Sequence, residues 1–192
     1  MLSLRRSMRW SPRRQGRTPR QTHTSEVSFR VEPLAEHDVA GFRCGIEELD
    51  DWLVSHARAA NGQGTRTYVL VGADGSVAGY YAITPHFLAR EQAPARIARG
   101  APRQIPAILL AKLALDRSHQ GAGLGSELLV ASLTTIIEAA RLAGGRLAVV
   151  DAINDQARHF YEHHNFELLP GNNRRLVMKL STAAKALGLD WP

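Results

Sequence analysis

The feature that most constrains this fold is a glycine-rich turn between an apolar run and an amphipathic stretch. The segment Ala107 to Val130 reads AILLAKLALDRSHQGAGLGSELLV. A Q-x-x-G-x-G pattern within it is formed by Gln120, Gly121, Ala122, Gly123, Leu124 and Gly125. The apolar run predicts a strand that is covered on both faces, and the restart predicts a helix. Glycines let a backbone approach a diphosphate, and helix N-termini attract anions. The turn is a candidate phosphate site, although a tight strand-to-helix connection also needs glycine for structural reasons alone.

A second motif follows the predicted helix. The apolar run Arg146 to Asp151 predicts another strand, and after it Asn154 to Tyr161 fit N-x-x-A-x-x-F-Y. This pair of motifs resembles the GNAT acetyltransferase superfamily, over roughly Val27 to Leu180. The resemblance implies an α/β GNAT fold, with a mixed and mostly antiparallel central sheet flanked by helices. It also implies acetyl-CoA as co-substrate.

The same resemblance implies roles for individual residues. The acetyl-CoA diphosphate is expected on residues 120–125, and the pantetheine arm is expected beside Asn154, which either binds that arm or only caps a helix. Backbone groups of Leu113 and Leu115 are expected to face the acetyl end, where an N–H group would stabilise a developing oxyanion. Tyr161 matches the tyrosine that protonates or hydrogen-bonds the CoA sulfur. Because a phenol with a pKa of about 10 is a weaker acid than a thiol of about 8.5, we expect hydrogen bonding rather than full proton transfer.

The N-terminal half resembles a narrower group. Four short motifs carry that resemblance, and they are Phe42 to Gly45, Leu49 to Leu53, Thr65 to Val69 and Gly79 to Ala82. They resemble the acetyltransferase toxins of type II toxin–antitoxin systems. The resemblance implies that the acceptor is the α-amine of aminoacyl-tRNA, that translation is blocked, and that a small ribbon-helix-helix antitoxin binds the protein. It also allows for a homodimer.

No general base stands out beside Tyr161, since Glu162, His163 and His164 point in different directions on a helix. An α-amine titrates at about 7.7 to 8.0, against about 10.4 for lysine, so it needs a base less. This is consistent with an aminoacyl acceptor. Two alternatives stay open: a GNAT enzyme that acetylates a protein N-terminus, a lysine or a small amine, and a catalytically inactive GNAT-like binding module. No metal is expected.

Charge divides the chain into a tail and a domain. Residues 1–25 hold seven arginines and no acidic residue, whereas residues 26–192 hold 17 Lys or Arg and 18 Asp or Glu. We predict a disordered Arg-rich tail over 1–25, a GNAT domain over 26–180 and a C-terminal tail over 181–192 without a structural signal. A mitochondrial transit peptide, a start at Met8 or beyond, and an RNA-binding arm are alternative explanations of the first 25 residues. Because no run approaches the ~20 apolar residues of a membrane span and Cys44 is the single cysteine, we expect a cytoplasmic protein without a membrane anchor.

Helical spacing predicts a helix over Ile46 to Asn61, and the Asp74-Gly75 turn predicts a hairpin of Thr67–Val71 with Val77–Ile83. Phe87 to Pro106 is predicted to be a long loop with room for a short helix. Four arginines of this segment would suit a phosphate backbone and are candidate RNA contacts, or else belong to a solvated loop: Arg90, Arg96, Arg99 and Arg103.

Overall fold

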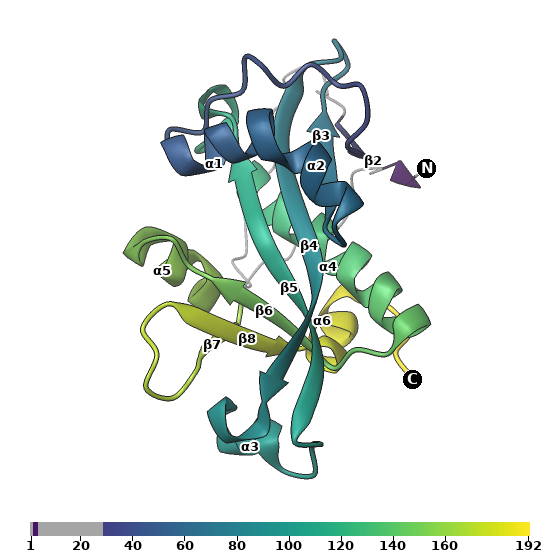
Figure 1. The fold of residues 1–192 in the computed structure, drawn as a ribbon, viewed down its shortest axis with the longest axis vertical. Helices are drawn as coiled ribbons and strands as arrows, with labels where there is room; N and C mark the ends of the chain where they lie inside the picture. Colours follow the sequence, from purple (N-terminus) through teal and green to yellow (C-terminus); the bar gives the residue numbers. More distant parts are fainter. Residues whose placement is uncertain (1, 4–28) are drawn as a thin grey trace, which may run out of the picture.

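The computed structural model describes Leu2–Ser3 and residues 29–192, and it contains one mixed sheet flanked by helices (Figure 1). The strand order is β1-β2-β3-β4-β5-β6-β8-β7. Within the described residues β5 and β6 form the only parallel pair, which confirms the predicted mostly antiparallel α/β sheet. No helix of this part of the chain has the length and apolarity needed to cross a membrane.

The strands are β1 Leu2–Ser3, β2 Arg30–Pro33, β3 Arg66–Val71, β4 Val77–Ala89, β5 Gln104–Leu115, β6 Leu147–Asp151, β7 Glu167–Leu168 and β8 Arg175–Lys179. The helices are α1 Glu47–Asp51, a π-helical segment η1 Trp52–His56, α2 Ala57–Gly62, α3 Ala95–Ala98, α4 Leu124–Ala143, α5 Asp155–His163 and α6 Leu180–Leu187. Two short 3-10 turns, η2 Arg90–Gln92 and η3 Arg117–His119, precede α3 and the glycine turn. Apart from β1, the predicted disordered tail 1–25 lies outside the described residues.

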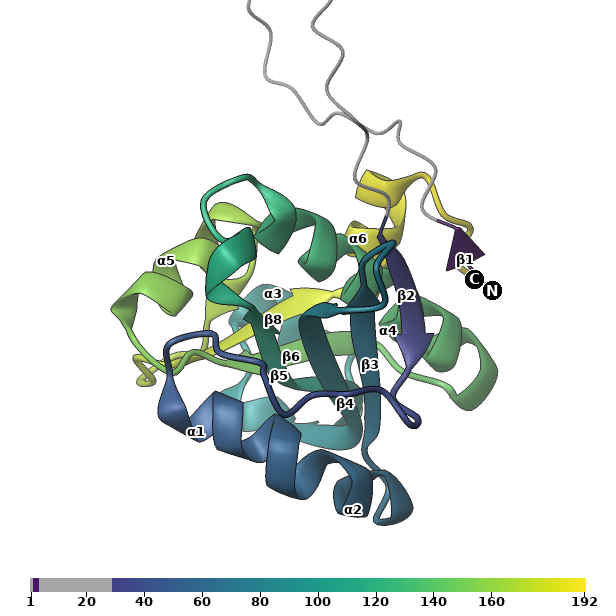
Figure 2. The ribbon, with the colours of Figure 1, turned by 90° about the horizontal axis from the view of Figure 1, so that it is seen from above.

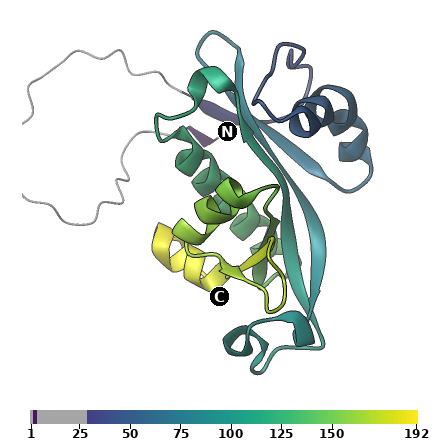
Figure 3. The same ribbon diagram turned by 90° about the vertical axis from the view of Figure 1, so that its left-hand side faces the viewer.

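Helices cover opposite faces of the sheet (Figures 2 and 3). On one face α4 packs its predicted apolar stripe, including Leu128, Ile136 and Ile137, against β4, β5 and β6. On the other face α1, η1 and α2 cover the β3–β4 end of the sheet through Leu49, Leu53 and other apolar side chains. A third cluster beneath α3 covers the far end of β4 and β5.

The predicted loop from Phe87 to Pro106 is shorter than expected, because both of its ends are strand, and it contains the short helix that the sequence allowed, α3. β4 continues to Ala89 and β5 begins at Gln104, and these two residues pair, so the segment extends the β4–β5 hairpin with α3 at its tip. The extension buries Leu88, Ile97 and Ile105. Prolines and arginines between these apolar positions hide the alternation that marks a strand.

The C-terminal residues also differ from a structureless tail. Residues 180–187 form α6, and its Leu180, Ala183 and Ala184 belong to the same core as α4. The core therefore extends past the predicted domain end at residue 180. Asn165 has φ 64°, a left-handed conformation that asparagine adopts more readily than most residues other than glycine.

Candidate active site

A gap opens between β5 and β6 at the middle of the sheet. The two strands pair only over Ala107–Leu110 and Leu147–Val150, although β5 runs on to Leu115. The change coincides with a bulge: Ala82 of β4 faces Lys112, whereas the next residue, Ile83, faces Leu110. A bulge bends its strand and re-aims the residues after it. The last residues of β5 thus have one edge that β6 does not cover.

Backbone N–H groups of β5 point into this gap. Asp116 N donates to Ala78 O of β4 at 2.9 Å. Because N–H groups alternate between the two edges of a strand, those of Leu115 and Leu113 point away from β4 and toward the gap. Their side chains pack against the main core. The structure therefore places the N–H groups of Leu113 and Leu115 at the gap, and their role toward the acetyl end of acetyl-CoA stays a prediction.

The glycine turn leads directly from the gap to the start of α4. Gly121 and Gly123 have φ values of 81° and 85°, and a Cβ atom at either position would meet nothing within 4 Å. Gly123 is also the N-cap of α4, so no side chain caps the first turn. Within residues 29–192, the N–H groups of Gly121, Ala122 and Gly123 donate no backbone hydrogen bond. Unpaired N–H groups on an open surface at a helix N-terminus fit a diphosphate.

Gln120 holds this turn in place through its side chain. Its Nε2 donates to Cys44 O and to Leu115 O, both at 2.9 Å, and so ties the turn to the end of β5 and to the loop before α1. Gln120 is therefore positioned to orient the turn, and both protons of its side-chain amide donate to these two carbonyl oxygens. Burial and the Asp50 carboxylate raise the pKa of the neighbouring Cys44 thiol to about 11.

Tyr161 lies on α5, whose other side chains close the gap. Gly125 shows how tightly the elements meet, because a Cβ atom there would lie 3.7 Å from Leu115 Cδ1 and 3.8 Å from Phe160 Cε2. Tyr161 itself is only 7% exposed, and its hydroxyl makes no hydrogen bond to any described residue. Burial raises the pKa of Tyr161 above its usual range, so the phenol keeps its proton at neutral pH. Such a group can donate a hydrogen bond to a developing anion.

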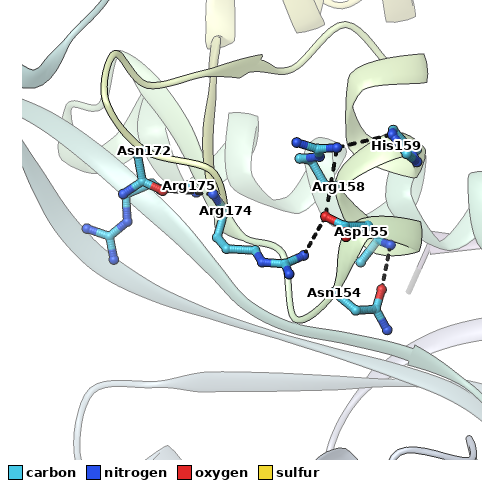
Figure 4. Close-up of polar contacts among 8 residues, drawn as sticks. Asn154, Asp155, Arg158, His159, Asn172, Arg174 and Arg175 are labelled. Carbon is cyan, nitrogen blue, oxygen red and sulfur yellow. Dashed lines mark hydrogen bonds and ion pairs between the residues drawn. The ribbon is translucent and has the colours of Figure 1, made fainter.

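Asn154 caps α5, the helix that follows β6 (Figure 4). Its Oδ1 accepts a hydrogen bond from Ala157 N at 2.8 Å. The capping role that the sequence left open is thus realised. Its Nδ2 amide makes no hydrogen bond to another described residue, so a role toward the pantetheine arm stays a prediction.

We expect Asn154→Ala to lower the free energy of unfolding by about 1 kcal/mol, since the cap of α5 is lost. Asn154→Ser retains a capping oxygen but lacks the amide. If Asn154 also donates to acetyl-CoA, the serine variant will unfold like the wild type in urea but bind acetyl-CoA more weakly. Equal affinity for the serine variant would limit Asn154 to capping.

A polar cluster beside α5 was missed by the sequence analysis. Arg174 donates to Asp155 Oδ1 at 3.0 Å, Arg158 lies 3.8 Å from the same atom, and Arg158 also contacts His159 (Figure 4). Asn172 Oδ1 accepts from the backbone N–H groups of Arg174 and Arg175 and so shapes the β7–β8 turn. The pair of Asp155 and Arg174 joins residues 19 positions apart, on α5 and beside β8, and no local motif predicts it.

A second missed contact joins α5 to the glycine turn. His164 Nε2 lies 3.0 Å from Ser126 Oγ in the first turn of α4, and His164 Nδ1 lies 2.8 Å from Phe160 O. The sequence indicated no role for His164 beyond its place beside Tyr161 on a helix. Its ring is half-buried and braces the two helices that flank the predicted cofactor path.

The four arginines predicted to contact RNA lie at the tip of the β4–β5 hairpin, at the other end of β5 from the glycine turn (Figure 1). β5 alone spans roughly 36 Å at about 3.3 Å per residue. Arg96 pairs with Glu167, and Arg90 donates to Ala101 O. Arg99 and Arg103 are exposed and form no ion pair within residues 29–192.

Comparison with known proteins agrees with this geometry. A family model described as the Acetyltransferase (GNAT) family matches residues 28–166. A protein of Mycobacterium tuberculosis (strain ATCC 25618 / H37Rv) named tRNA-acetylating toxin is 38% identical over 151 residues, which cover 79% of this chain and 91% of that protein.

Two solved structures are similar over nearly their whole length. One is AtaT complexed with acetyl-methionyl-tRNAfMet, with a TM-score of 0.76, 27% identity, and coverage of 83% of this chain and 99% of that one. The other is a tyrosine-to-phenylalanine mutant of the AtaT toxin bound to acetyl-CoA and to the C-terminus of the antitoxin AtaR. It has a TM-score of 0.72, 26% identity, and coverage of 83% and 98%.

Proposed function

Because the chain belongs to the GNAT acetyltransferase family, we propose that it transfers acetyl from acetyl-CoA to the α-amine of aminoacyl-tRNA, and so blocks translation as the toxin of a toxin–antitoxin pair. The observation that carries this proposal is that the glycine turn, whose N–H groups donate no backbone hydrogen bond within residues 29–192, directly follows the edge of β5 that β6 leaves free. Tyr161 lies on α5, whose Phe160 packs beside the start of α4. The 38% identity to a tRNA-acetylating toxin supports the acceptor.

Each part of the site has its own role in the proposed acetyl transfer. We assign the diphosphate to Gly121 to Gly125, and we assign to Leu113 N–H the stabilisation of negative charge on the acetyl carbonyl oxygen. Acetyl-CoA supplies an acetyl group already activated as a thioester. The neutral amine attacks that carbonyl carbon and forms the C–N bond, and the C–S bond breaks as Tyr161 donates a hydrogen bond to the departing thiolate. The nitrogen loses one proton to solvent as the amide forms. Because its pKa is raised, Tyr161 stabilises the thiolate without giving up its proton.

An acetylated α-amine explains the effect on translation. The amide that forms has no basic lone pair, so the modified aminoacyl ester cannot attack a peptidyl ester and extend a chain. Arg99 and Arg103 are our candidates for phosphate contacts, since they are exposed and unpaired within residues 29–192. They lie far enough from the gap that only an extended ligand such as tRNA would reach both places.

The proposed toxin function also implies protein partners. AtaT is bound by the C-terminus of an antitoxin, and we infer that this chain also binds an antitoxin, of the ribbon-helix-helix type. A homodimer is our expectation for the free toxin. Since charged tRNA is used where translation occurs, we assign the protein to the cytoplasm.

The test uses purified protein, radiolabelled acetyl-CoA, and total tRNA in charged and deacylated form. We expect label in the RNA fraction only with charged tRNA. A peptide with a free N-terminus and a small-amine panel run beside it test the alternative acceptors. Label in these but not in RNA would overturn the proposal, and failure to bind acetyl-CoA would favour an inactive binding module.

A further inference from the structure

One lysine stands at the gap on the face opposite the glycine turn. Lys112 follows the bulge in β5 and directly precedes Leu113. Its ammonium lies 3.0 Å from Glu48 Oε1 of α1 and 5.9 Å from the centroid of the Trp52 ring in η1. Since α1 and α4 cover opposite faces of the sheet (Figure 3), Lys112 lies on the face away from α4.

The lysine is held firmly at this place. Trp52 stacks on Tyr80 with the ring centroids 5.8 Å apart, and the Tyr80 hydroxyl donates to Leu49 O at 2.8 Å. These contacts fix α1 and η1 over the sheet. The Lys112 side chain is only 20% exposed, whereas that of its partner Glu48 is 68% exposed. Water therefore screens the carboxylate more than the ammonium.

Resting on the proposed function, we propose that Lys112 is a specificity-determining residue that selects acceptor amines in their neutral form. With the diphosphate site and α5 on the α4 face, the α1 face is left for the acceptor. A protonated amine that approaches Leu113 from this face meets a like charge. A like charge disfavours the ammonium and lowers the pKa of the entering amine. An α-amine, at about 7.7 to 8.0, needs only a small shift to be neutral at pH 7, whereas a lysine side chain at about 10.4 needs a much larger one.

Other charged groups on the surrounding elements are committed elsewhere or stand apart. The Asp50 carboxylate accepts a hydrogen bond from Cys44 N, and the Asp51 carboxylate accepts one from Ser55 Oγ and lies near His56. The Asp116 carboxylate accepts hydrogen bonds from Arg43 N and Ser118 N. Asp151 forms an ion pair with Arg175. His86 of β4 pairs with Ala107, nearer the hairpin tip. Glu47 of α1 forms no ion pair within residues 29–192. Glu48 is thus the acid that partners Lys112.

The experiment measures single-turnover acetyl transfer at saturating acceptor between pH 6 and 8, because such a rate reports groups in the bound complex. Lys112→Met should move the acidic limb of the profile up by about one pH unit, and Glu48→Gln should move it down by about half a unit. Lys112→Arg should keep the wild-type limb. Glu47→Gln is the matched control and should not move it.

Acetyl-CoA affinity and urea unfolding of each variant separate a local effect from misfolding. Parallel runs with charged tRNA and with an amino acid methyl ester separate this inference from the proposed function. If acetyl is transferred only to the ester, and the acidic limb of the pH–rate profile shifts in opposite directions for Lys112→Met and Glu48→Gln, tRNA is excluded as the acceptor and the role of Lys112 is retained. The role of Lys112 would be overturned if the acidic limb of the pH–rate profile is the same in all variants, or if it shifts in the same direction for Lys112→Met and Glu48→Gln.

Discussion

Replacing Tyr161 by phenylalanine will lower the rate of acetyl transfer by about 100-fold and leave the affinity for acetyl-CoA within about twofold of the wild type. The ring packs in the core against Phe166 and will stay there, so the variant loses only the hydroxyl. That hydroxyl makes no hydrogen bond to a described residue, so its removal leaves no internal donor or acceptor without a partner. Single-turnover rates and calorimetric titration with CoA measure the two quantities.

Tyr68→Phe is the matched control for this substitution. Tyr68 lies on β3 and stacks on Tyr81, so it loses the same atom at a distance from the gap. We expect its turnover to equal that of the wild type. Normal turnover in Tyr161→Phe would remove Tyr161 from the mechanism, and a large loss of CoA affinity would make it a binding residue instead.

Replacing Gly123 by valine will weaken acetyl-CoA binding by about 100-fold, as expected for the loss of about two charge-assisted hydrogen bonds. Gly123 has φ 85° and caps α4, a conformation that a β-branched residue adopts only with strain. The valine will therefore shift the N–H groups of the turn, and its side chain will occupy the open space that faces a ligand. Calorimetric titration with acetyl-CoA gives the change in affinity.

Gly64→Val separates backbone strain from the loss of the site. Gly64 has φ 95° and lies between α2 and β3, and a Cβ atom there would meet nothing within 4 Å. Both variants should lose about 1 to 2 kcal/mol of unfolding free energy. Only Gly123→Val should lose acetyl-CoA affinity. Equal loss in both, or in neither, would mean that the glycine turn is not the diphosphate site.

The sequence predicted the parts of the fold that depend on local patterns. The α4 helix, the β3–β4 hairpin and the strand before the glycine turn follow from apolar periodicity and turn residues close together in the chain. These features need no knowledge of distant contacts.

Features that depend on distant contacts were not predicted. The extension of β4 and β5 past residue 87 requires the burial of Leu88 and Ile105 beneath α3. The helix α6 packs on α4 and begins without a side-chain cap, so that only Gly188 at its end marks it in the sequence. The site shows the same limit, since the Q-x-x-G-x-G turn is a local motif whereas the Lys112–Glu48 pair joins residues 64 positions apart.

The most direct test of the proposed function is to identify the acetylated atom in the product. Total charged tRNA is incubated with the enzyme and acetyl-CoA and digested with ribonuclease, and the 3′-terminal nucleoside esters are analysed by mass spectrometry. We predict N-acetyl-aminoacyl-adenosine, with the acetyl group on the α-amine even for lysyl esters. Aminoacyl-adenosine without acetyl, from enzyme shown to bind acetyl-CoA, would contradict the proposed function.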